Sequence, residues 1–220
     1  GMHGTSHCYV SEQAEQYLGL EMHQLNAISV HLGNGCSMTA IQQGKSIDTS
    51  MGLSPLPGLM MGTRSGDIDP AVIFYLADRL DMSLQEIDQL LNKQSGLKGI
   101  AGDNDMRSIV SRYEQGDPQA TLALEMYCYR IKKYVGAYLA VTGAIHALIF
   151  TAGVGENSAL VREKSCQGLE HLGILLNVGK NQQKKSGIQE IQDEESRVKI
   201  LVVPTNEELS IAEQAYRLIQ

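Results

Sequence analysis

The chain has 220 residues, long enough for one sizeable α/β domain or two small ones. Hydrophobic residues make up 43% and charged residues 20%, which is typical of a soluble globular protein and excludes an intrinsically disordered chain. The net charge is −7, the pI is near 5.4, and lysine and arginine are scattered, so DNA or RNA is not expected as a partner. A nucleotide is not excluded, because a few backbone amides and one arginine can bind its phosphates.

The four cysteines lie far apart in the sequence and form no C-x-x-C pair: Cys8, Cys36, Cys128 and Cys166. This spacing is typical of reduced thiols and predicts a cytoplasmic protein. The longest apolar run, near residues 144–152, contains His146 and is too short to span a membrane, so neither a membrane partner nor a secretion signal is expected. The start at Gly1-Met2 has two interpretations, a remnant of a tag or a segment cut from something longer.

The first part of the chain predicts one helix and then a three-stranded β-meander. The helix is expected over Thr5–Gly19, with Ala14, Tyr17 and Leu18 on its buried side. Short turns containing Gly33-Asn34-Gly35 and Gln43-Gly44-Lys45 favour antiparallel pairing of the strands they separate. These strands are expected over Ala27–Leu32, Ser37–Ile41 and Ser46–Thr49.

The middle of the chain predicts a loop followed by helices. Residues 52–66 are rich in glycine and proline and indicate a loop. Asp69-Pro70 begins a helix to about Leu80, and Ser83 forms a capping box with Glu86. Asp117-Pro118 begins the longest helix, which reaches about Thr142. Its apolar stripe favours a place in the core over a subunit interface: Tyr127, Ile131, Tyr134, Tyr138 and Leu139.

The last part of the chain returns to strands alternating with helices. Leu148–Thr151 and Lys199–Val203 read as buried strands. Ser158 caps the helix after the first of them, and Thr205 with Glu208 forms a capping box for a closing helix through Leu218. A β-meander followed by alternating helices and strands predicts one mixed α/β domain.

Two glycine-rich segments suit an anion. The turn Gly33-Asn34-Gly35 is either an ordinary hairpin turn or a cradle of exposed N–H groups for phosphate, to which His31 could also donate. Residues 152–158 join an apolar strand to a helix through glycines, which favours either a tight turn or an anion site at the helix N-terminus. This segment is no dinucleotide fingerprint, and the chain contains no Walker A loop.

Two charged residues have a structural and a chemical interpretation each. Arg64, in a glycine-flanked loop, could clamp a phosphoryl or carboxylate group, or form a salt bridge to Asp67 or Asp69. Glu207 has no part in the expected capping box. It could bind Mg²⁺, or could act only as favourable charge at the start of a helix.

Two further groups of polar residues favour structural roles. His3 and His7 are spaced to share a metal ion on a helix, but no third ligand is nearby, so a surface pair is expected. Asp105 is expected to be the N-cap of a helix that includes Arg107. The chain contains no G-x-S-x-G elbow, which argues against a serine hydrolase.

Five motifs, taken in order, resemble those of the acetate/propionate kinases. The match runs from His3 to the last expected helix, and the first and third motifs are the distinctive ones. The resemblance implies the fold of the actin, hexokinase and sugar-kinase superfamily, whose two ribonuclease-H-like lobes close over ATP. The motifs are His3-Gly4-Thr5-Ser6-His7, His31-Leu32-Gly33-Asn34-Gly35, Pro57-Gly58-Leu59-Met60-Met61-Gly62-Thr63-Arg64-Ser65-Gly66-Asp67, Gly153-Val154-Gly155-Glu156-Asn157 and Pro204-Thr205-Asn206-Glu207-Glu208.

The resemblance also implies a reaction and a role for each motif. ATP would transfer a phosphoryl group in line to acetate or propionate, giving an acyl phosphate and ADP, reversibly. His3 and Arg64 would stabilise the transferring group, and Glu207 would bind Mg²⁺. This agrees with the residues themselves, because phosphoryl transfer needs positioning and positive charge rather than a nucleophilic side chain. The nucleotide would be held by His31, Leu32, Gly33, Asn34, Gly35, Asp105, Met106, Arg107, Gly153, Val154, Gly155, Glu156 and Asn157.

Length is the main departure from this family, whose members are nearly twice as long. The resemblance therefore implies that residues 1–220 are a single C-terminal nucleotide-binding domain of a two-lobed kinase, without the N-terminal lobe, and that this half forms a homodimer. Cys36 stands where a small residue such as serine is usual. Two alternatives stay open: a nucleotide-binding and dimerisation fragment that is inactive alone, and a non-catalytic ATPase or sensor, against which the motifs around His3 and Arg64 argue.

Overall fold

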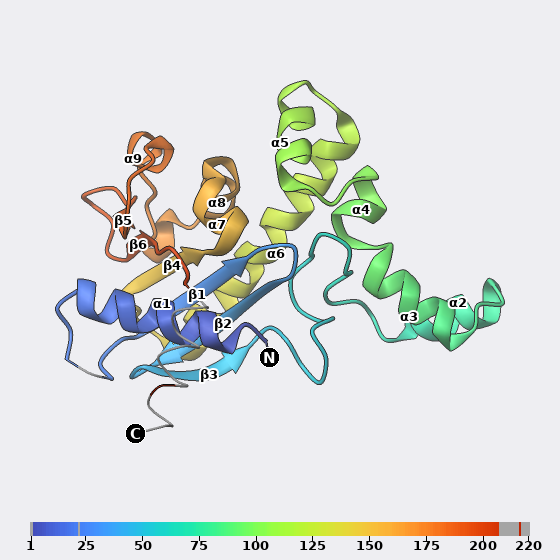
Figure 1. Ribbon diagram of the computed structural model, residues 1–220, viewed down its shortest axis with the longest axis horizontal. Helices are drawn as coiled ribbons and strands as arrows, with labels where there is room; N and C mark the ends of the chain where they lie inside the picture. Colours follow the sequence, from blue (N-terminus) through green and yellow to red (C-terminus); the bar gives the residue numbers. More distant parts are fainter. Residues whose placement is uncertain (1, 22, 207–215, 217–220) are drawn as a thin grey trace.

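The structure, a computed structural model, describes residues 2–21, 23–206 and 216 (Figure 1). At its centre lies a six-stranded mixed sheet in the order β3-β2-β1-β4-β6-β5. The strands expected from the sequence are confirmed to within a residue at each end, and the short β5 is additional. In chain order they are β1 (Ala27–Leu32), β2 (Cys36–Gln42), β3 (Lys45–Thr49), β4 (Ala147–Thr151), β5 (Gln189–Glu190) and β6 (Lys199–Val202).

The first three strands form the expected antiparallel meander. Leu32 pairs with Cys36 beside the glycine turn, and Ala27 pairs with Ile41 at the other end. β4 then lies parallel to β1, β6 lies parallel to β4, and β5 is antiparallel to β6. A meander continued by parallel strands beyond β1 is the ribonuclease-H-like arrangement, so the predicted α/β fold class is confirmed.

Helices connect and cover these strands. The expected N-caps are confirmed at Ser83, Asp105, Asp117 and Ser158, whose side chains accept hydrogen bonds from the first helical turn. Three short helices, α4, α7 and α9, are not predicted by the sequence. The helices are α1 (Gly4–Tyr17), α2 (Ala71–Arg79), α3 (Leu84–Lys93), α4 (Gly96–Ala101), α5 (Met106–Glu114), α6 (Pro118–Thr142), α7 (Ala152–Asn157), α8 (Ala159–Cys166) and α9 (Val178–Gln182), with a 3-10 turn, η1 (Glu170–Leu172).

The sheet is covered on both faces, by α1 on one side and by α6 on the other (Figure 1). Successive side chains of a strand point to opposite faces, and β1 is buried along its whole length. Ile28 and Val30 belong to the larger core cluster, which includes α6, whereas Ala27 belongs to a smaller cluster with Val10 and Ala14 of α1. Because both faces are buried, the ends of β1 and β4 are rigid places from which to build a site.

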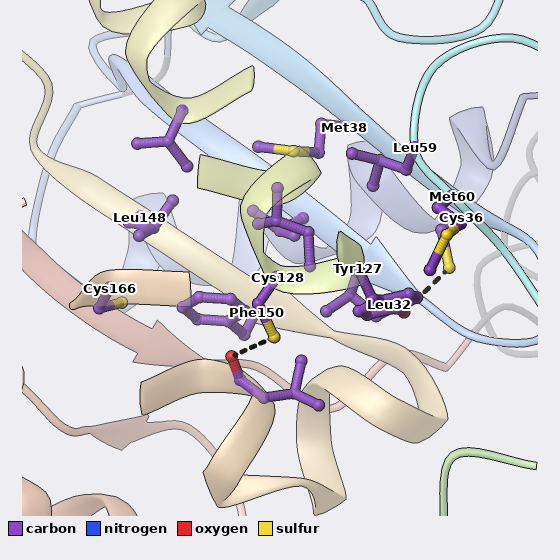
Figure 2. Packing of buried hydrophobic residues seen from close by; sticks show 14 of the residues in the cluster. Leu32, Cys36, Met38, Leu59, Met60, Tyr127, Cys128, Leu148, Phe150 and Cys166 are labelled. Carbon is purple, nitrogen blue, oxygen red and sulfur yellow. Dashed lines mark hydrogen bonds between the residues drawn. The ribbon is translucent and has the colours of Figure 1, made fainter. Parts of the chain in front are cut away.

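The larger cluster contains the apolar stripe of α6 (Figure 2). Tyr127, Ile131 and Tyr138 are buried, and Tyr134 and Leu139 are half-buried, so the core interpretation of this stripe is confirmed. Figure 2 shows Tyr127 and Cys128 on α6 close to buried side chains of the sheet.

One expectation for α1 is wrong. Ala14 is buried and Leu18 packs against the smaller cluster, but Tyr17 is 47% exposed. The helix ends at Tyr17, and its phenol, after Lys199 and Gln192, helps to lower the pKa of Glu190 on β5. A tyrosine can keep its polar end near such a group while leaving its ring partly in water.

The sequence predicts a closing helix that begins at the capping box of Thr205 and Glu208 and ends at Leu218. Most of this range, including Glu208, lies outside the described residues. Thr205 itself is described, and its hydroxyl contacts Ser6 Oγ at 2.9 Å. All four cysteines are free thiols. None of the helices within the described ranges is long and apolar enough to cross a membrane.

Candidate functional site

A cavity of about 900 Å³ opens beside the C-terminal ends of β1 and β4. Its walls include three segments far apart in the sequence: the β1–β2 turn, the start of α5 and the helix α7. Such a volume lies within the range of nucleotide and cofactor sites. Most of the residues singled out for a nucleotide therefore share one cavity. Those lining it are Gly33, Asn34, Asp105, Met106, Arg107, Gly153, Val154 and Asn157.

The β1–β2 turn is the tight glycine turn expected between two strands. Gly33 N donates to Gly35 O at 3.0 Å, which closes the turn. Residues outside the turn hold Asn34 in place. Its carbonyl accepts a hydrogen bond from Gly62 N at 3.2 Å, and its Oδ1 accepts one from Asn104 Nδ2 at 3.2 Å. A Cβ at Gly62 would lie 2.5 Å from Asn34 Oδ1, so any larger residue there would displace the Asn34 side chain. The turn is thus fixed against the loop that carries Arg64.

The start of α5 forms the second wall. Asp105 accepts from Arg107 N at 2.9 Å, as expected of an N-cap, and also pairs with the Arg107 guanidinium at 2.6 Å. This pairing lowers the pKa of Asp105 to about 2. Met106 is buried, whereas the Arg107 side chain is 91% exposed. The wall therefore combines an apolar floor with a charged rim, which suits a ligand with a flat ring and polar edges.

The third wall corrects an expectation. Residues 153–157 are not a glycine turn before a helix but are themselves the short helix α7. The strand passes directly into this helix, whose first residue, Ala152, adopts a left-handed φ of 65°. Gly153, Val154 and Asn157 line the cavity, whereas Gly155 packs against the backbone of β4.

Glu156 points elsewhere than expected. Its carboxylate accepts a hydrogen bond from Thr205 N at 3.1 Å, and it lines a separate, smaller cavity of about 190 Å³. Gly155 and Glu156 are therefore connected to the site through their backbone rather than their side chains. Their carbonyls both accept from Arg162 Nη1 at 2.9 Å.

His3, His7 and His31 cluster between α1 and β1, which contradicts the expected surface pair. His7 is 6% exposed, since Ser6 and His7 lie on the face of α1 that packs on the sheet. The rings of His3 and His31 stack with centroids 3.9 Å apart, and His7 meets His31 edge-on. Burial, followed by the neighbouring histidines, lowers the pKa of both His7 and His31 to about 3, so both rings are neutral at neutral pH.

Arg64 reaches the glycine turn from the long loop after β3. A Cβ placed on Gly35 would lie 3.2 Å from Arg64 Nη1 and 3.5 Å from His3 Nε2, so these two side chains meet over Gly35. The salt bridge considered for Arg64 is not formed. Asp67 instead accepts from Gly58 N and from the hydroxyl of Tyr134, and it holds the loop against α6.

The loop around Arg64 is also fixed by backbone hydrogen bonds to α3 and α4. Ser65 N donates to Leu91 O, and Leu97 N donates to Met61 O at 2.9 Å. The helix α4, which the sequence did not predict, therefore supports the loop that carries Arg64. Among the described residues, the contacts of the guanidinium are long, to Pro55 O at 3.4 Å and to Met61 Sδ at 3.7 Å.

Leu32 and His31 end β1 and lead into the turn, but they face away from the cavity. Leu32 is in the larger core cluster, and His31 Nδ1 contacts Ser6 Oγ at 2.9 Å. Glu207, expected to bind Mg²⁺, lies outside the described residues. Within the described ranges, no group of three or more His, Cys, Asp or Glu side chains is arranged to hold a metal ion.

Three supporting residues, Ser37, Asn104 and Arg162, were not found by sequence reasoning. Asn104 holds the glycine turn, Arg162 holds α7, and Ser37 contacts two histidines. Each acts through a contact with a distant segment, so no local pattern reveals it. A buried arginine on an amphipathic helix is the one signal of this kind that a sequence could offer.

The chain resembles proteins of one family throughout its length. A sequence model described as the acetokinase family matches residues 1–213. The acetate kinase of Lawsonia intracellularis (strain PHE/MN1-00) is 56% identical over 219 residues, covering 100% of this chain and 54% of that protein. The crystal structure of Porphyromonas gingivalis acetate kinase superposes with a TM-score of 0.95 at 45% identity, covering 99% of this chain and 55% of that one.

A propionate kinase from Francisella tularensis subsp. tularensis SCHU S4 superposes with a TM-score of 0.91 at 48% identity, covering 96% of this chain and 54% of that one. The chain thus spans little more than half the length of the relatives it matches. Since the family match includes every wall of the cavity and the loop of Arg64, the chain belongs to the acetokinase family.

Proposed function

We propose that this chain is the C-terminal, nucleotide-binding part of an acetate or propionate kinase, which transfers a phosphoryl group reversibly between ATP and a short-chain carboxylate. One observation carries the proposal. The glycine turn 33–35 borders the large cavity on one side and the pair of His3 and Arg64 on the other. A nucleotide in the cavity would thus direct its phosphates towards a guanidinium and an imidazole.

Different walls of the cavity would bind different parts of the nucleotide. Asn34 and Gly35 would donate backbone N–H groups to the phosphates, and Gly33, whose own N–H closes the turn, would let the phosphates approach the backbone. Asp105, Met106 and Arg107, with Gly153, Val154 and Asn157, would hold the adenosine. Leu32, His31, Gly155 and Glu156 would act indirectly, by positioning these walls, since their side chains are not among those lining the cavity.

The chemistry follows from where positive charge is concentrated. A carboxylate oxygen attacks the terminal phosphorus as the bond to the ADP oxygen breaks, and negative charge spreads over the equatorial oxygens. Arg64 and His3 would stabilise that charge from the side of Gly35. Glu207 would help hold Mg²⁺, which neutralises part of the triphosphate charge. Mg²⁺ is commonly held by one or two carboxylates together with substrate phosphates, so Glu207 would share the ion with ATP.

The remaining parts of the enzyme are expected elsewhere. The similarity covers 54% of the Lawsonia relative, so the carboxylate-binding residues would belong to an N-terminal lobe. A homodimer through this half and a cytoplasmic location are part of the same proposal. The free thiols of all four cysteines suit a reducing compartment.

ADP binding by the 220-residue chain tests the assignment of the cavity. Gly153 lines the cavity, and a Cβ there would meet nothing within 4 Å, so Gly153→Leu should fill the cavity without straining the fold. We expect calorimetry to show that the chain binds ADP and that Gly153→Leu weakens this at least about tenfold. Gly136→Leu on α6 is the matched control, because Gly136 is also free of close neighbours and lies outside the cavity. Equal binding by both variants would remove the cavity from the proposal.

Trapping of the acyl phosphate with hydroxylamine tests the reaction. The full-length gene product should form hydroxamate from ATP and acetate or propionate, and the 220-residue chain alone should not. Turnover by the chain alone would show that no second lobe is needed. Nucleotide binding without turnover by the full-length product would favour the alternative, a non-catalytic nucleotide-binding and dimerisation module.

A further inference from the structure

Ser37 of β2 lies between two histidine rings. Its Oγ is 2.8 Å from His3 Nδ1 and 2.8 Å from His7 Nε2. The other nitrogen of His7, Nδ1, lies 2.9 Å from Ser29 Oγ on β1. Ser29, His7, Ser37 and His3 thus form one chain of hydrogen bonds from the interior of the α1–sheet interface to the ring that faces Gly35.

The direction of this chain is determined at its buried end. Ser29 is fully buried, and within the described ranges His7 Nδ1 is the only hydrogen-bond partner of its hydroxyl. A buried hydroxyl proton without an acceptor is unfavourable, whereas an unused lone pair is tolerated much better. Ser29 therefore donates to His7 Nδ1, and this nitrogen carries no proton.

The remaining protons follow in order. His7 is buried and neutral, with a pKa lowered to about 3, so its single ring proton is on Nε2 and is donated to Ser37. The Ser37 proton then has two acceptors available, His3 Nδ1 at 2.8 Å and Met2 O at 3.5 Å. The shorter contact is the stronger hydrogen bond. His3 accepts through Nδ1, so a His3 ring that holds a single proton carries it on Nε2.

We propose that His7 is a positioning residue: through Ser37 it holds His3 in the tautomer whose Nε2 carries the proton, so that His3 presents a hydrogen-bond donor to the transferring phosphoryl group. The last step rests on the proposed function, because it is Nε2 that faces Gly35 and Arg64. The tautomer itself does not depend on that function. With the reverse order of protons, His3 would offer a bare nitrogen to an anion.

Nitrogen-15 NMR of the 220-residue chain at pH 7.5 tests the tautomers directly. Two-bond proton–nitrogen correlations distinguish rings protonated at Nε2 from rings protonated at Nδ1. His146 is an internal reference, because its Nδ1 accepts from Asn26 N at 2.9 Å and must be bare. We expect His3 and His7 to show the His146 pattern. A proton on Nδ1 of either ring would overturn the proposal.

A serine substitution tests whether the tautomer depends on Ser37. In Ser37→Ala the His3 ring should become a mixture of the two tautomers. Ser46→Ala on β3 is the control, because Ser46 contacts Thr39 and none of the histidines, and it should leave the His3 signals unchanged. A pure Nε2-protonated His3 in Ser37→Ala would overturn the proposal.

A matched pair at His7 tests the consequence for catalysis in the full-length protein. Glutamine can place its amide nitrogen near the position of Nε2 and donate to Ser37, whereas asparagine reaches only the position of Nδ1. We expect His7→Gln to keep kcat within about threefold and His7→Asn to lower kcat about tenfold or more, with the KM for ATP nearly unchanged in both. Equal loss in both variants would reduce His7 to a packing residue and overturn the proposal. An inactive wild-type protein would instead refute the proposed function, and the NMR result would still decide the tautomers.

Discussion

Arg64 is the best-supported cation of the site at the scale of single residues. Its loop is fixed to α3, α4 and α6, yet within the part of the chain that the structure describes its guanidinium makes two long contacts, with Pro55 O and Met61 Sδ. Asp67, an expected partner, is already occupied by Gly58 N and Tyr134. A planar guanidinium that is positioned but weakly bonded is well suited to bind an anion that arrives with the substrate.

Replacing Arg64 by lysine should therefore lower kcat in the full-length protein by about 10²–10³-fold, because an ammonium cannot reproduce the planar, two-point contact. Hydroxamate formation under saturating ATP measures this. Arg79→Lys is the control, since Arg79 lies on α2 in an exposed ion pair with Asp78, and its activity should equal that of the wild type. A fully active Arg64→Lys would show that Arg64 does not contact the reacting group.

At this scale, sequence reasoning succeeded where the interaction is local. The caps at Ser83 and Asp117 use a side chain and the backbone of the next turn, and both were predictable. The burial of His7 was not, because it depends on Ser29 and Ser37 in two strands that come later in the chain. The absence of a salt bridge between Arg64 and Asp67 was equally unpredictable, because Asp67 accepts a hydrogen bond from Tyr134 of the distant helix α6.

Among the secondary-structure elements, α7 is the one whose position depends most on a single residue. Arg162 of α8 is 3% exposed and donates to the carbonyls of Gly155 and Glu156, and it also contacts Asn181 of α9 through Oδ1 and O. These four contacts satisfy the buried guanidinium without a carboxylate, and burial lowers its pKa to about 10. The third wall of the cavity is thus held by a buried charge.

Arg162→Lys should lower the free energy of unfolding by roughly 2–4 kcal/mol, because an ammonium cannot reach all four acceptors and leaves buried oxygens unsatisfied. It should also weaken ADP binding, since α7 would no longer be held in place. Urea denaturation and calorimetry on the 220-residue chain measure both effects. Arg197→Lys, at an exposed position, is the control and should change neither. Unaltered stability of Arg162→Lys would contradict this view of α7.

Elements with strong periodicity or caps were predictable, and short elements stabilised by tertiary contacts were not. α6 has a proline and an N-cap at its start and a continuous apolar stripe. α4 contains Gly96 and Gly99 within six residues, which disfavours a helix locally. It forms because its first N–H groups donate to Met61 O and Gly62 O in the Arg64 loop. The helical state of residues 153–157 was missed for the same reason.

For the molecule as a whole, two buried, neutral histidines make the free energy of unfolding depend on pH. The pKa of both His7 and His31 is lowered to about 3, chiefly by burial. In the unfolded chain each would titrate near 6.5. Between these values the unfolded state binds more protons than the folded state, so stability is complete above about pH 6.5 and is lost as the pH falls towards 3.

Each histidine contributes at most about 1.4 kcal/mol per pH unit, so we expect the free energy of unfolding to fall by roughly 2–3 kcal/mol between pH 6 and pH 5. Urea denaturation of the 220-residue chain at several pH values measures the slope. His7→Gln should flatten the slope by about half, because one titrating group is removed. His171→Gln, at an exposed position, should not affect it. A slope that is the same for both variants would show that His7 is charged in the folded protein.

The parallel pairing of β1 with β4 has a consequence for how the chain acquires its structure. Ala27 pairs with Ala147, so more than half of the chain must emerge from the ribosome before the central strand gains its second neighbour. Until then the meander of β1, β2 and β3 would present the edge of β1, in addition to the edge of β3, to other chains in a crowded cell. Closing so distant a contact is slow compared with forming hairpins. Aggregation during synthesis would thus compete with this single docking step, and a chaperone that shields the edge of β1 would raise the yield of native protein.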